Sequence, residues 1–222
     1  MEMKNKTIIL GLVAVVALAG IFWYGGWGKG NQTASVIGGE QNKNSDENIG
    51  INVNSFIIGG DIALGSPDAP VTMIEYSSHL CGHCVNFHLN TLPTLIEKYV
   101  QTGQLKIISR LVSPLDLSNA VICAGEQNAF YQFDEYLFSH IQDLSSVDDI
   151  RAIAGRLGLS QEIFDACYDD ADKYRDQIEG WFAQAEVDGV TGTPTFFING
   201  EEIVGNQSLE VFESVIEKYL NQ

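Results

Sequence analysis

Cys81 and Cys84 give this sequence its clearest chemical signal, because two thiols three positions apart can form and break a disulfide with each other. They follow an apolar, β-branched run at 71–76 that predicts a buried strand, and they precede residues with helical spacing. The cysteines therefore open a helix, where free backbone N–H groups and the helix dipole stabilise an anion. Because the thiolate is the reactive form of cysteine, we expect Cys81 to be the nucleophile and Cys84 to resolve the mixed disulfide.

Other residues near the two cysteines are candidates for supporting roles. His83 lies between them and adds partial positive charge near neutral pH. Glu75 lies six residues before Cys81 on the predicted strand, where a buried carboxylate is costly unless it has a function. That function would be to accept or donate the proton of Cys84, and a half-exposed edge position is the alternative. We expect His79 at the rim of the site, in contact with substrate.

A metal site is the competing interpretation from another functional class. The possible ligands are Cys81, Cys84, His79, His83 and His88. A closed zinc site needs four ligands from two convergent groups, and the sequence has no second group with such spacing. We therefore expect no metal, with His88 on a helix face and His140 in a structural role. A purely structural Cys81–Cys84 bridge is a further alternative, although so tight a loop is redox-labile.

The N-terminal residues 1–27 predict a membrane anchor. Lys4 and Lys6 precede an uncharged apolar run, with aromatic residues at its far end. Roughly 20 such residues cross a hydrocarbon core of about 30 Å. The lysines predict a cytoplasmic N-terminus and a single-pass anchor, which places the remaining chain in the periplasm or at the cell exterior. A cleaved signal peptide is the alternative, because Ala17-Leu18-Ala19 has the form of a cleavage site.

The rest of the chain divides into a linker and one domain. Residues 28–55 are rich in Gly, Asn, Gln and Ser, which is typical of a flexible tether. The domain covers 56–222. Its strand at 71–76, a helix over 85–99 and a strand over 105–112 form a βαβ unit, which predicts a parallel strand pair.

An all-helical insertion of about 114–189 follows this unit. Helical spacing recurs over 130–141, 147–157, 163–167 and 174–185. After the insertion, apolar runs on both sides of Asn199-Gly200 predict a β-hairpin, and an amphipathic helix ends the chain.

Cys123 and Cys167 both lie in this insertion, each on an apolar stretch. They are either separate buried thiols or a structural disulfide. Outside the cytoplasm the disulfide is favoured, and closing a loop of this length stabilises by roughly 3–4 kcal/mol.

Composition restricts the possible partners. The chain has 222 residues, of which 45 % are hydrophobic, so it is long enough and apolar enough for a folded core. Its net charge of −17 argues against nucleic acid as a partner, because phosphates would be repelled.

Four segments together resemble the DsbA-like thiol–disulfide oxidoreductases of the thioredoxin superfamily, and the resemblance covers about 56–222. They are Asp68-Ala69-Pro70-Val71, Glu75-Tyr76-Ser77-Ser78, Cys81-Gly82-His83-Cys84 and Gly189-Val190-Thr191-Gly192-Thr193-Pro194-Thr195-Phe196-Phe197. The resemblance implies an α/β thioredoxin-like fold with a helical insertion. It also implies that Pro194 is cis and faces the active-site sulfurs, and that Thr193 offers backbone hydrogen bonds to substrate. Gly82 would lie at the same substrate-binding surface.

The resemblance further implies dithiol–disulfide exchange with exported proteins, without a cofactor. Net oxidation is the expected direction, by a monomer reoxidised by a membrane quinone reductase of the DsbB kind. A reductase or isomerase is the alternative. The Gly-His dipeptide between the cysteines is more like that of protein disulfide isomerase than the Pro-His of DsbA, which leaves the oxidising strength open.

Overall fold

The computed structural model describes residues 55–58 and 60–222. The predicted anchor over 1–27 and all but the last residue of the predicted linker lie outside this range. Within the described residues, no helix combines the length and the apolar character that crossing a membrane requires.

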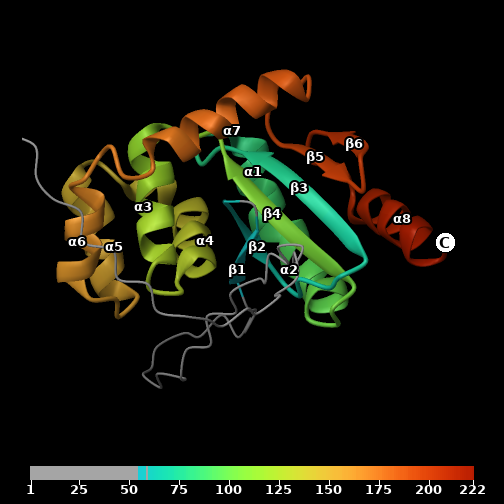
Figure 1. Cartoon of the computed structure of the whole chain (residues 1–222), viewed down its shortest axis with the longest axis horizontal. Coiled ribbons are helices and arrows are strands. Elements are labelled where there is room, and N and C mark those ends of the chain that lie inside the picture. The colour runs from blue at the N-terminus through green and yellow to red at the C-terminus, as the bar shows by residue number, and fades with distance from the viewer. Residues whose placement is uncertain (1–54, 59) are drawn as a thin grey trace, which may run out of the picture. The chain divides into compact units, whose positions relative to one another are not determined.

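A six-stranded sheet forms the centre of the described domain (Figure 1). Its strands run in the spatial order β1-β2-β4-β3-β5-β6. Their bounds are β1 Ser55–Ile58, β2 Asp61–Leu64, β3 Val71–Ser77, β4 Leu105–Leu111, β5 Thr195–Ile198 and β6 Glu201–Val204. Only β3 and β4 pair in parallel, and every other neighbouring pair is antiparallel.

The parallel strands are joined by one continuous helical stretch. It runs through α1 (Gly82–Asn86), η1 (Phe87–Thr91), α2 (Leu92–Leu95) and η2 (Ile96–Val100), where η1 and η2 are π-helical turns. This arrangement confirms the predicted βαβ unit. The apolar side of the stretch packs on one face of the sheet together with α8 (Leu209–Leu220).

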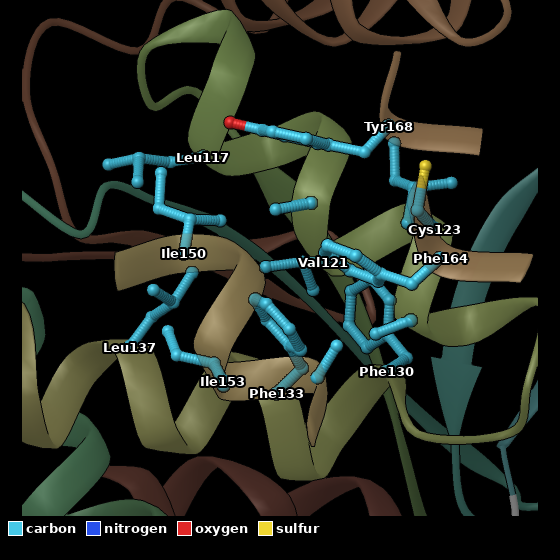
Figure 2. Packing of buried hydrophobic residues seen from close by; sticks show 14 of the residues in the cluster. Leu117, Val121, Cys123, Phe130, Phe133, Leu137, Ile150, Ile153, Phe164 and Tyr168 are labelled. Atoms are coloured by element: carbon cyan, nitrogen blue, oxygen red, sulfur yellow. The ribbon is translucent and has the colours of Figure 1, made fainter. Parts of the chain in front are cut away.

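The predicted helical insertion is also confirmed, and it contains one α-helix and one short 3₁₀ helix more than the spacing indicated. It consists of α3 Leu115–Gly125, α4 Phe130–His140, the short η3 Ile141–Asp143, α5 Val147–Arg156, α6 Gln161–Tyr168 and α7 Arg175–Val187. Helices α3 to α7 share a core with the end of β4, in which the rings of Phe133, Phe164 and Tyr168 stack in sequence (Figure 2). Residues Ser146 and Asp149 form a capping box at the start of α5.

The predicted hairpin at Asn199-Gly200 joins β5 to β6, with Ile198 opposite Glu201. Both turn residues have positive φ, 45° at Asn199 and 90° at Gly200, as the turns that match strand twist require. The Asn199 side chain also accepts a hydrogen bond from the Thr72 backbone, 2.9 Å away, and so ties the turn to β3.

Candidate active site

The two cysteines lie where the sequence predicts them, at the junction of β3 and the helical stretch. Cys81 is the N-cap of α1, and its carbonyl accepts from the Val85 backbone N–H at 3.0 Å. Its side chain is partly exposed, whereas Cys84, inside the first turn, is fully buried. Both are free thiols, so the structure is that of the dithiol form. Gly82 and His83 are exposed beside them.

The surroundings of the two thiols shift their pKa values in opposite directions. Burial acts to raise the pKa of Cys81, but hydrogen bonds from the side chains of Thr193 and Cys84 and from the backbone at Cys84 and His83 outweigh it, so the pKa is lowered. Burial raises the pKa of Cys84 to about 12, although the nearby Ser77 hydroxyl acts in the opposite sense. Cys81 is therefore the more readily ionised thiol.

A loop from the far end of the chain completes the site. The Thr193-Pro194 peptide bond is cis, and the Cys81 thiol donates to the Thr193 carbonyl oxygen, with Sγ and O 3.1 Å apart. Pro194 is buried and Thr193 is half-buried. The structure thus brings the two sequence segments together across 112 positions of chain.

A network of hydrogen bonds fixes α7, the helix that leads into this loop, against the second face of the sheet. Arg110 on β4 forms an ion pair with Asp61 on β2, with Nη2 and Oδ2 2.9 Å apart, and Trp181 on α7 donates to the same carboxylate at 2.6 Å. At the end of α7, Asp188 accepts from the Tyr76 hydroxyl at 2.6 Å. The loop therefore begins from a point anchored to three strands.

Glu75 is fully buried on β3, so the half-exposed alternative is wrong. Its Oε1 lies 2.8 Å from Nε2 of His88, which is 3 % exposed. Sequence reasoning placed His88 on a helix face without a role. The signal that identifies it is its position among apolar residues at helical spacing, where a polar side chain must find a partner.

The expectation for His79 is wrong. This residue is fully buried and cannot contact substrate. Its Nδ1 lies 2.9 Å from the Ser113 hydroxyl, and its Nε2 lies 2.7 Å from Oδ1 of Asp134 on α4. Asp134 was missed, although it falls on the apolar side of the predicted helix together with Phe130, Leu137 and Phe138. A carboxylate on such a face is the signal that could have found it.

The ligands suggested for a metal do not converge around Cys81. His79 and His88 bond to different carboxylates, and His83 is exposed. In the described part of the chain, the acid and sulfur ligands that do converge are those of Cys123, Glu126 and Cys167. The two sulfurs are joined to each other at 2.04 Å in a disulfide, across 44 positions of chain.

Comparison with known proteins identifies the family. The family model described as Thioredoxin matches residues 58–218. Alpha-DsbA1 from Wolbachia pipientis is 31 % identical in sequence, its crystal structure superposes with a TM-score of 0.67, and the match covers 74 % of this chain and 94 % of that one. This chain is a DsbA-like thiol–disulfide oxidoreductase.

Two further relatives agree with membership of the DsbA-like family. A Rickettsia typhi protein named as a candidate protein-disulfide oxidoreductase is 27 % identical over 198 residues, which cover 86 % of this chain and 73 % of that protein. Disulfide bond formation protein D from Bacillus subtilis is 24 % identical over 177 residues, which cover 73 % and 78 % of the two chains.

Proposed function

We propose that this DsbA-like chain is a disulfide-forming oxidase for exported, cysteine-containing polypeptides. The observation that carries the proposal is the opposed ionisation of two thiols at one helix N-terminus, with Cys81 lowered in pKa and Cys84 raised. Stabilisation of the Cys81 thiolate lowers the free energy of the reduced protein, and this makes the Cys81–Cys84 disulfide a stronger oxidant.

The reaction starts from the Cys81–Cys84 disulfide. A substrate thiolate attacks Sγ of Cys81, the bond between the two sulfurs breaks, and Cys84 leaves with the electron pair and takes up a proton. A second substrate thiolate then attacks the substrate sulfur of the mixed disulfide. The substrate leaves with its new disulfide, and Cys81 remains as the stabilised thiolate, so two electrons have moved from substrate to protein.

The neighbouring residues have separate roles in this scheme. Thr193 and Pro194 bind the substrate chain next to the reacting sulfur, and the Thr193 carbonyl that accepts from Cys81 is available once the thiol is consumed. Gly82 leaves the approach to the sulfurs open, because it carries no side chain. His83 adds positive charge near the thiolate, and Glu75 exchanges the proton of Cys84.

The midpoint potential of the Cys81/Cys84 couple tests the direction of the reaction. We expect about −180 mV, the value for protein disulfide isomerase, since Gly-His separates the cysteines as it does in that protein. The full chain is equilibrated in glutathione buffers, and its reduced fraction is quantified. A value near that of thioredoxin, about −270 mV, would overturn the oxidase and favour a reductase.

Continued oxidation needs a partner that removes electrons, and we propose a membrane quinone reductase of the DsbB kind. A monomer held by an N-terminal anchor over 1–27 would meet such a partner at the membrane surface outside the cytoplasm. We expect N-terminal sequencing of the membrane fraction to find the original N-terminus. A mature chain that begins near Gly20 would mean cleavage instead.

A further inference from the structure

The Glu75–His88 contact joins the same strand and the same helical stretch that carry Ser77 and the buried Cys84. Glu75 and Ser77 are two positions apart on β3 and so face the same side of the sheet. Cys84 and His88 are four positions apart on one helical stretch and so share a face of it. Ser77 acts on the Cys84 thiol, and Glu75 bonds to His88, so the two contacts form successive layers between strand and helix.

The Glu75–His88 contact leaves one polar atom of each side chain without a hydrogen-bond partner among the described residues. The two side chains are 1 % and 3 % exposed, and Oε1 and Nε2 lie 2.8 Å apart. The other carboxylate oxygen, Oε2, and the other ring nitrogen, Nδ1, are buried and have no hydrogen-bond partner among the described residues. Burying a carboxylate oxygen without a hydrogen bond lowers the stability of the fold, which a purely structural role does not explain. It does retain one atom that can receive a proton.

The surroundings of His88 favour its cationic form. Its ring stacks on Phe138 of α4, with centroids 3.6 Å apart and planes 19° from parallel. Burial acts to lower the pKa of His88, but the charge of Glu75 and its hydrogen bond, together with the charges of Asp134 and Glu135 on α4, raise it.

The remaining polar groups near His88 do not reverse this balance. His88, Asp134, the Tyr131 hydroxyl from α4 and the hydroxyl-bearing Ser109 from β4 line one small cavity. The second buried histidine, His79, lies 2.7 Å from Asp134. No lysine or arginine lines that cavity among the described residues.

We propose that His88 is a positioning residue for the exchange reaction, holding the Glu75 carboxylate by Oε1 and leaving Oε2 to take the Cys84 proton. This inference rests on the proposed function. When Cys84 attacks the Cys81–substrate disulfide, its S–H bond breaks and its proton passes to Glu75. The Cys84–Cys81 bond then forms, and the substrate leaves as a thiolate. In the oxidising direction the same proton returns to Cys84.

The test isolates the step that Cys84 performs. Reduced full-length protein is mixed with oxidised glutathione, and the formation and resolution of the Cys81–glutathione disulfide are followed separately over a range of pH. We expect His88→Gln to slow resolution about tenfold at pH 7 and to shift its pH profile upward, because the buried carboxylate loses its cationic partner. Attack by Cys81 should change much less.

Two further variants decide whether His88 acts through Glu75. Glu75→Gln should slow resolution at least as much as His88→Gln, and the double variant should be no slower than Glu75→Gln alone. His140→Gln, a change of the same kind on a half-buried histidine at the end of α4, should leave both steps unchanged. Additive losses, or a loss in His88→Gln that is equal at every pH, would overturn the proposal.

A measurement on the unaltered protein covers the case in which these variants fail to fold. Nitrogen NMR of the histidine side chains, followed over a range of pH, should show that the His88 ring loses its second proton above the ordinary pKa of about 6.5. Loss of that proton at or below the ordinary value would overturn the inference. If the unaltered protein forms no mixed disulfide with glutathione, the proposed function itself fails. Mixed disulfide formation with an unchanged His88→Gln profile rejects only the role of His88.

Discussion

Cys81 and Cys84 carry the same functional group in surroundings that act on it oppositely. The first thiol faces the helix N-terminus and the Thr193 loop, and the second lies fully buried one turn inside the helix. Since the anionic form needs either solvent or hydrogen-bond donors, Cys81 is the thiol that ionises more readily.

We predict that the Cys81 thiolate titrates below the roughly 8.5 of a free thiol. The backbone at Cys84 and His83 supplies hydrogen bonds that persist when the second thiol is removed. The alkylation rate of a Cys84→Ala variant, measured against pH, should rise to its plateau with a midpoint below that value, because the thiolate exists above the pKa. Titration at or above about 8.5 would contradict it.

Sequence reasoning at the scale of residues succeeded where a short motif defines both position and chemistry. Cys81, Cys84 and Glu75 could be placed because they lie on one strand and the helix that follows it. His79 could not, because its burial depends on Asp134, which arrives from a helix 55 positions later. Contacts of that range are invisible to spacing.

Helices and strands, like single residues, could be predicted where the local sequence carries a clear signal and were missed elsewhere. The βαβ unit and the hairpin at β5 and β6 have strong local periodicity or turn signals, and they were predicted. Helix α3 was not, because its residues are buried without interruption from Leu117 to Ala124, so no polar stripe marks a helical period. The hairpin of β1 and β2 was also missed, although Gly59-Gly60 between two apolar runs is a turn signal of the recognised kind.

The capping box of α5 provides a prediction at this scale. The Ser146 hydroxyl accepts from the Asp149 backbone N–H at 3.3 Å. We expect Ser146→Ala to lower the free energy of unfolding by about 1 kcal/mol, because one backbone donor at the helix start loses its partner.

Chemical denaturation of the two proteins measures this difference. Ser208→Ala is the matched control, since Ser208 is the N-cap of α8 but makes no cap hydrogen bond through its side chain. An equal loss in both variants would mean that the capping box contributes nothing of its own.

At the scale of the molecule, the Cys123–Cys167 disulfide ties α3 to α6, and Figure 2 shows Cys123 within the core of the insertion. We expect replacement of both cysteines by Ala to lower the free energy of unfolding by roughly 3–4 kcal/mol, because the unfolded chain regains the freedom of a closed loop of 44 positions. Thermal unfolding measures the loss. A double variant as stable as the unaltered protein would show that the bond constrains nothing in the unfolded chain.

The rings of His79 and His88 both lie against Phe138, a residue of the insertion. Helix α4 therefore packs against the histidines near the catalytic cysteines, which belong to another part of the sequence. For protein engineering, this means that the insertion is not an interchangeable module. In a chimera that receives the helices of a relative, positions 134 and 138 would carry the relative's residues, while His79 and His88, which contact them, would stay those of this chain. Such exchanges should retain activity only when both sides of this internal boundary are transplanted together.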